Sequence, residues 1–114
     1  MDESTTALNE ILELTTALRT SDEPLFARLR FLLPSHDIDP RTTYLVELFP
    51  DDTNFEFGVL VATDGRIYQF GFDYLNCKIS EGLLAEWRDL TLGNIEPLYS
   101  AKVLLGLDLL RAAT

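Results

Sequence analysis

The chain has 114 residues, of which 46% are hydrophobic and 25% are charged, a balance typical of a folded globular domain rather than a disordered one. Its 19 acidic and 9 basic residues give a net charge of −10, which disfavours binding to nucleic acid and to anionic membranes. The single cysteine excludes an internal disulfide, and no apolar run is long enough to cross a bilayer. The first ten residues are acidic and do not show the basic-then-apolar pattern expected of a secretory signal. We therefore expect one cytoplasmic domain that spans residues 1–114.

Two helices are predicted in the first third of the chain. The first begins near Ser4 or Thr5, either of which can cap it, and has aliphatic side chains on one side. The second begins at Pro24, because proline is favoured in the first turn of a helix, and ends before Pro34. Its predicted buried stripe consists of Leu25, Phe26, Leu29, Leu32 and Leu33.

Three strands are predicted next, beginning with Tyr44 to Phe49. Two runs of alternating aromatic and β-branched residues then flank Asp64-Gly65, a dipeptide that favours a two-residue type I′ hairpin turn. This turn places Val59 opposite Phe70 and collects the large side chains on one face of the sheet. These are Phe55, Phe57, Val59, Val61, Tyr68, Phe70, Phe72 and Tyr74.

Two further helices are predicted in the last third of the chain. The first runs from Ser80 to Gly93 and buries Trp87 among leucines. The second begins near Pro97 and continues almost to the C-terminus. The element order is therefore ααβββαα, an α+β domain in which helices pack on a three-stranded antiparallel meander.

The same register predicts a row of acids on the opposite, open face of the sheet. It places Glu47 opposite Glu56 and Glu56 opposite Asp73. Like charges directly across strands destabilise a sheet, so the row needs solvent, arginines of this chain or a basic partner to relieve it. Asp51 and Asp52 follow the first strand and add to the acidic surface. We expect a partner-binding surface made of Glu47, Glu56, Asp73, Asp51 and Asp52.

The last predicted helix is apolar on nearly every side. Leucines and a valine form two separate stripes, and Leu104 projects from a third side. Such a helix is either enclosed by its own domain or shared with another subunit, and enclosure is difficult in so small a chain. We therefore expect a homodimer with Leu104 and Leu107 at its interface.

No catalytic, cofactor or metal-binding motif is present in the sequence. His36 with nearby aspartates and the lone Cys77 have no matching ligand or catalytic partner along the chain, so we expect no metal, no cofactor and no enzymatic activity. Size and charge favour a small acidic interaction protein that binds and neutralises a basic partner protein, as immunity proteins, antitoxins and inhibitors do. The alternative is a small-molecule-binding or enzymatic α+β domain with a pocket between sheet and helices.

Overall fold

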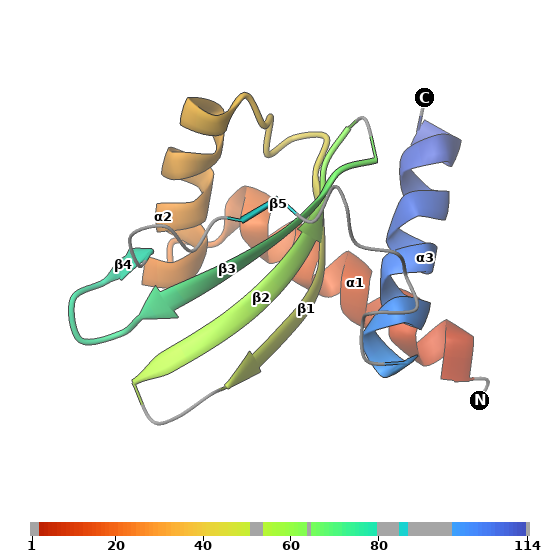
Figure 1. The fold of residues 1–114 in the computed structure, drawn as a ribbon, viewed down its shortest axis with the longest axis horizontal. Helices are drawn as coiled ribbons and strands as arrows, with labels where there is room; N and C mark the ends of the chain where they lie inside the picture. Colours follow the sequence, from red (N-terminus) through yellow and green to blue (C-terminus); the bar gives the residue numbers. More distant parts are fainter. Residues whose placement is uncertain (1–2, 51–53, 64, 80–84, 87–96, 114) are drawn as a thin grey trace.

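A computed structural model describes residues 3–50, 54–63, 65–79, 85–86 and 97–113, and all structural statements refer to them. Helix α1 (Glu3–Thr20) leads to helix α2 (Pro24–Leu32), which continues as a short 3-10 helix, η1 (Leu33–His36). Three long strands follow, namely β1 (Tyr44–Pro50), β2 (Phe55–Val61) and β3 (Ile67–Asp73). Two short strands, β4 (Lys78–Ile79) and β5 (Ala85–Glu86), precede helix α3 (Pro97–Ala113). Figure 1 shows the sheet between α2 and α3.

The α+β class is confirmed, but the predicted element order is not. The sheet is antiparallel with the order β1-β2-β3-β4, and β5 also pairs with β3, so two short strands extend the predicted meander. The helix predicted from Ser80 to Gly93 is wrong at Ala85 and Glu86, which pair with β3. The rest of that predicted helix, including Trp87, lies outside the described residues.

The predicted register of the β2–β3 hairpin is wrong by one residue. Val59 pairs with Gln69, because the connection is a three-residue loop rather than a two-residue turn. The Gly65 N–H donates to the Ala62 carbonyl at 2.9 Å, and the Ala62 N–H donates to the Arg66 carbonyl at 2.8 Å. Gly65 has a φ of 83°, the left-handed conformation that closes this type of loop. A slip of one residue exchanges the two faces of a strand, so the predicted single aromatic face does not form.

The β1–β2 register also differs from the prediction, and β1 contains a β-bulge. Phe49 pairs with Phe57 instead of Asn54. The register shifts between Leu45 and Glu47, so that Val46 is the extra residue of the bulge. As a consequence the consecutive residues Val46 and Glu47 lie on the same side of the sheet, the side that α3 covers.

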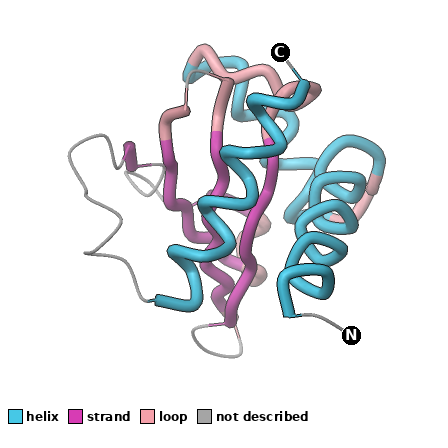
Figure 2. Tube along the Cα trace, turned by 90° about the vertical axis from the view of Figure 1, so that its right-hand side faces the viewer, coloured by secondary structure: helices cyan, strands magenta, loops and turns pink. Residues whose placement is uncertain are grey.

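Apolar side chains cover both faces of the sheet, whereas the sequence predicted one buried face. The α2-side core contains Leu18, Leu25, Phe26, Leu29, Leu33, Ile38, Leu45, Leu60, Ala62, Tyr68, Phe70 and Phe72. The α3-side core contains Ile11, Val46, Val59, Val61, Ile67, Val103 and Leu110. Helix α1 contributes to both cores, and Figure 2 shows α3 lying along one face of the strands with α1 to their side.

The outer edge of β1 offers no free N–H group to another strand. The Leu45 N–H donates to the hydroxyl of Thr15 in α1 at 3.0 Å. The Leu48 N–H donates to Oε1 of the neighbouring Glu47, also at 3.0 Å. The next outward position is Pro50, which has no N–H. Exposed strand edges promote association between sheets. In this protein a hydroxyl of α1, a carboxylate and a proline prevent another strand from pairing with the edge of β1.

Thr15 and Thr16 provide a matched test of this edge contact. Thr15 is 2% exposed, and valine in its place leaves the buried Leu45 N–H without an acceptor. We expect Thr15→Val to lower the free energy of unfolding by about 1–3 kcal/mol in urea titrations. Thr16 is exposed and bonds only within its own helix, so Thr16→Val should change stability by less than about 0.5 kcal/mol. Equal effects of the two substitutions would contradict the edge role of Thr15.

Gly106 allows α3 to lie close to the sheet. A Cβ atom at this position would lie 2.5 Å from Val46 Cγ1 and 3.0 Å from Val61 Cγ2. We expect Gly106→Ala to destabilise the protein by about 1–3 kcal/mol, in spite of a gain of about 1 kcal/mol in helix propensity. Adding Val46→Ala removes one of the blocking methyl groups, so the two substitutions should be less than additive in a double-mutant cycle. Strict additivity would exclude close approach as the cause.

Candidate partner-binding site

The predicted row of three carboxylates does not exist in the structure. Glu47 lies beside Val59 on the α3 side of the sheet, and Glu56 pairs with Phe72 on the α2 side. Asp73 pairs with Phe55 instead of Glu56. The cause is the pair of register errors, because a shift by an odd number of residues moves every acid of one strand to the other face. Asp51 and Asp52 lie outside the described residues.

Glu47 belongs to an ion cluster that also contains Lys102 and Glu10, called here the Lys102 cluster. The Nζ atom of Lys102 lies 2.7 Å from Oε2 of Glu10 and 2.8 Å from Oε2 of Glu47. The side chains of Lys102 and Glu47 are 10% and 12% exposed, while that of Glu10 is 50% exposed. The cluster therefore joins α3 to both α1 and β1, and Glu47 is not free to bind a partner.

Two opposing effects act on the pKa of Lys102. Burial is the largest single effect and lowers it, because an ammonium group loses hydration. The hydrogen bonds to Glu10 and Glu47, together with their negative charge, outweigh burial and raise the pKa above its ordinary value. Lys102 therefore stays charged and holds the carboxylates together.

Replacing Lys102 by methionine tests the cluster, with Lys78→Met as the matched control. Lys102→Met leaves two carboxylates facing each other, and we expect the free energy of unfolding at neutral pH to fall by about 2 kcal/mol. Lys78 is exposed and forms no ion pair with another described residue, so Lys78→Met should lower the free energy of unfolding by less than about 0.5 kcal/mol.

The stability difference between wild type and Lys102→Met should also depend on pH. A raised pKa stabilises the folded state fully below the unfolded value of 10.5, and this contribution disappears as pH rises through the folded pKa. We expect a constant difference from about pH 7 to about pH 10 and a smaller one above it, in urea titrations across that range. A difference that does not shrink at alkaline pH would contradict the assignment.

A second arrangement, the acidic recess, combines Glu23, Glu56 and Tyr74. These residues line a cavity of about 280 Å³ whose remaining lining comes from Pro24, Leu25, Phe26 and Leu48. The Tyr74 hydroxyl donates to Oε1 of Glu56 at 2.5 Å. Glu23 is the N-cap residue of α2, but its side chain makes no capping hydrogen bond. The recess therefore holds one carboxylate bonded to a phenol and another with no bond of its own.

The ionisation of Tyr74 reports the negative charge of the recess. Partial burial raises the pKa of Tyr74 to about 12, and the hydrogen bond to Glu56 and the charges of Glu56 and Glu23 act in the same direction. All these effects disfavour a phenolate beside carboxylates. No lysine or arginine is among the described residues that line the recess, so none of these residues neutralises its charge.

Asp73 has a local structural role. Its Oδ1 accepts the Leu75 N–H at 2.9 Å, and its Oδ2 accepts the Asn76 side-chain amide at 2.5 Å. The hydrogen bond from Asn76 holds the pKa of the Asp73 carboxyl below its ordinary value. Asp73 thus stabilises the turn from β3 to β4 and does not lie with Glu47 or Glu56.

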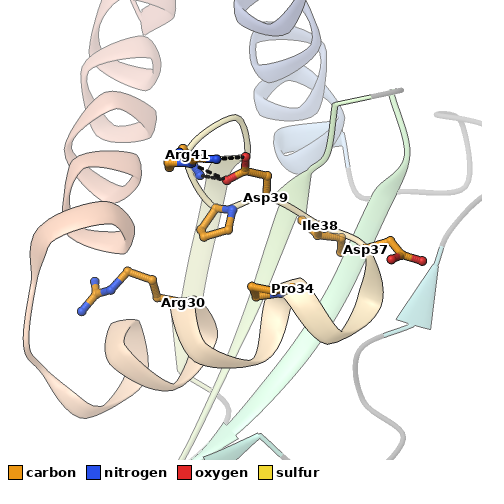
Figure 3. Close-up of a pocket in the computed structure, with 7 residues that line it drawn as sticks. Arg30, Pro34, Asp37, Ile38, Asp39 and Arg41 are labelled. Atoms are coloured by element: carbon orange, nitrogen blue, oxygen red, sulfur yellow. Dashed lines mark hydrogen bonds and ion pairs between the residues drawn. The ribbon is translucent and has the colours of Figure 1, made fainter.

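A wider cavity of about 600 Å³ lies between η1 and the segment that leads to β1 (Figure 3). Three of its four charged lining residues are already bonded within the chain. Asp39 and Arg41 form a two-fold hydrogen-bonded ion pair at 3.0 and 3.1 Å, and Arg30 donates to the carbonyls of Leu18 and Ser21. The Arg41 guanidinium lowers the pKa of Asp39, which therefore stays ionised. The cavity offers space, but Arg30, Asp39 and Arg41 already have partners, and Figure 3 shows the Asp37 carboxylate pointing away from the other lining side chains.

The two predicted interface leucines of α3 differ in their surroundings. Leu104 is 45% exposed, whereas Leu107 packs against the α3-side core. The buried side of the helix is formed by other residues, namely Lys102, Val103, Gly106 and Leu110. The described part of α3 is therefore amphipathic, and dimerisation through Leu104 and Leu107 stays a prediction.

Sequence reasoning found Glu56 but missed Glu23, Tyr74 and Lys102. The predicted register places Tyr74 on the buried aromatic face, and no pattern in the sequence marks Glu23 as part of a site. A signal for Lys102 was available, because it is a cation in a helix whose neighbours are mostly apolar. Within the described residues, no three or more His, Cys, Asp or Glu side chains are grouped so as to hold a metal ion.

No known family model, curated protein or solved structure matches the chain. Among the helices of the described residues, none has the length and apolar character needed to cross a membrane.

Proposed function

We propose that this protein is a small acidic interaction protein that binds a basic partner protein and inserts one partner lysine or arginine into the acidic recess. The observation that carries the proposal is the convergence of Glu23, Glu56 and the Tyr74 phenol on a cavity with apolar walls. Charged groups in such a setting attract a cation more strongly than the same groups on an open surface.

The shape of the recess favours a side chain rather than a whole small molecule. Its volume of about 280 Å³ lies below the ~300–1,000 Å³ typical of small-molecule sites. Lysine and arginine place their aliphatic stems on apolar surface and their charged ends beside polar groups. Leu25, Phe26 and Leu48 would contact the stem, and the carboxylates of Glu23 and Glu56 would bind the charged end.

The net charge of −10 gives this binding mode a kinetic advantage. A strongly acidic protein attracts a basic partner over distances comparable to the Debye length, about 8 Å at physiological salt. The recess then serves as the anchor of a larger contact, since stable protein interfaces bury about 1,600 Å² in total. Neutralisation of the partner would follow if that contact covers its functional surface, as in immunity proteins, antitoxins and inhibitors. The proposed setting is the cytoplasm, and the proposed role is binding rather than catalysis.

A pair of peptides that differ by one charge tests the proposal. The first is a short peptide with a central arginine, and the second has the neutral isostere citrulline instead. In NMR titrations at low salt, we expect the arginine peptide to shift the ring resonances of Tyr74 and the citrulline peptide to leave them unchanged. Glu23→Gln and Glu56→Gln should each weaken arginine-peptide binding by about fivefold, since each removes a charge-assisted hydrogen bond.

Glu13→Gln is the matched control, because Glu13 is an exposed acid of α1 outside the recess. This variant has the same change in net charge and should weaken binding by less than about twofold, since exposed charges are largely screened. If Glu13→Gln weakens binding as much as Glu23→Gln, the peptide responds only to net charge and the recess is not the site. Unchanged Tyr74 resonances would also contradict the proposal.

Small-molecule binding is the second candidate function, and the 600 Å³ cavity beside η1 favours it. This volume lies within the usual range for ligand sites. We rank it second because Arg30, Asp39 and Arg41 are bonded to groups of this chain and would have to exchange those bonds for a ligand.

A further inference from the structure

Phe31 is the most exposed large apolar side chain in the described part of the protein. It is 79% exposed, although it belongs to α2, whose Leu25, Phe26 and Leu29 are buried against the sheet. A single exposed apolar residue is common on protein surfaces and needs no explanation by itself. Its surroundings are what distinguish it.

Two cations without partners flank Phe31. Arg28 lies one helical turn before it in α2, and Lys78 lies in β4. Neither side chain forms an ion pair or hydrogen bond with any residue that the structure describes, although Lys78 is opposite Asp73, whose carboxylate is bonded to Leu75 and Asn76. The other cations of the described residues each contact a carbonyl oxygen, a carboxylate or an aromatic ring: Arg19, Arg30, Arg41, Arg66, Lys102 and Arg111. Although acids outnumber bases 19 to 9 in the chain, the two described cations without a described partner line the same cavity.

A cavity joins these side chains into one surface. It has a volume of about 190 Å³ and is lined by Arg28, Phe31, Leu32, Lys78 and Ile79, which together are called the Phe31 patch. A protein cavity of about 150 Å³ holds a benzene ring, so this one has room for a single aromatic or branched aliphatic side chain. The patch thus combines an apolar hollow with positive charge at its rim, the reverse of the acidic recess.

We propose that the Phe31 patch binds an acidic segment of a partner protein, with one apolar side chain in the cavity and flanking carboxylates on Arg28 and Lys78. The charges select this occupant. Carboxylates are the groups that unpaired guanidinium and ammonium ions bind best, and an apolar anchor between them would cover Phe31 and Ile79.

Other occupants fit the same surface less well. A second copy placed around a two-fold axis would bring Arg28 and Lys78 of both chains together, and the like charges would repel. An anionic membrane or nucleic acid would have to approach the whole molecule with its charge of −10. A short peptide segment contacts only the patch, and at physiological salt the acids beyond about 8 Å are largely screened from it.

This inference does not depend on the proposed function. It uses none of Glu23, Glu56 and Tyr74, so either surface can fail its test without affecting the other. If both tests succeed, the protein has a site for a basic side chain and a separate site for an acidic segment.

Isothermal titration calorimetry with a short synthetic peptide tests the patch. The probe has a central phenylalanine with glutamates on both sides, and its controls have serine for the phenylalanine or glutamine for the glutamates. We expect the probe to bind with a dissociation constant below about 100 μM at physiological salt, where the other acids of the chain are largely screened, and each control peptide to bind about tenfold more weakly. Phe31→Ser, Arg28→Gln and Lys78→Gln should each weaken the probe by about five- to tenfold, with unchanged circular dichroism.

Leu12→Ser and Arg111→Gln are the matched controls, because Leu12 is 40% exposed and the Arg111 side chain is 75% exposed, both outside the patch. They should change the affinity by less than about twofold. The proposal is overturned if these controls weaken binding as much as the patch variants, or if no binding occurs up to about 1 mM peptide. It is also overturned if Phe31→Ser abolishes a concentration-dependent dimer or binding to phosphatidylserine vesicles while peptide binding is absent.

Discussion

The ammonium group of Lys102 lies where α1, β1 and α3 meet, and the closure of the fold depends on its bonds. One carboxylate comes from the first helix and the other from the bulged strand, so a single cation fixes the last helix against both. The bulge has a part in this geometry, since it sends Val46 into the α3-side core and places Glu47 beside it. The other oxygen of Glu47 accepts the outward Leu48 N–H. The Glu47 carboxylate therefore has two roles: it occupies an N–H group at the edge of β1, and it holds α3 in place through Lys102.

The distribution of charge separates structural from exposed acids. The acids of the Lys102 cluster and of the Asp39–Arg41 pair form ion pairs with cations of the same chain, and Asp73 stabilises a turn. The acidic recess differs, because two carboxylates remain beside a phenol without a described cation. The Phe31 patch differs in the opposite sense, because two cations remain without a carboxylate. Both surfaces involve α2: Glu23 directly precedes its first residue, while Arg28 and Phe31 lie farther along it. A short helix packed on the sheet thus presents opposite charges toward its two ends.

Local sequence signals predicted α1, α2, α3 and the three long strands, but neither the short strands β4 and β5 nor how the strands pair. Pro24 marks the start of α2 because its effect depends on immediate neighbours only. Asp64-Gly65 is compatible with a two-residue turn and with a longer loop that has glycine in the left-handed conformation, and these differ by one residue in register. Hydrophobic alternation did not decide between them, because Val59, Leu60 and Val61 are all buried and the strand is covered on both faces. The acidic recess could not be predicted, since residues 23, 56 and 74 meet only after that register is set.

The two cores also differ in when their members are synthesised. Every member of the α2-side core, including the side chains packed against it, lies between residues 14 and 79, whereas the α3-side core needs Val103 and Leu110. Glu10 and Lys102 are 92 residues apart in the chain. At a translation rate of roughly 5–20 residues per second, Lys102 is synthesised about 5–18 s after Glu10, the carboxylate to which it binds. During this interval the sheet can bury one face while Val46, Val59 and Val61 still lack their covering helix. On the ribosome, the exposed side of the nascent sheet is therefore the side that the Lys102 cluster later closes.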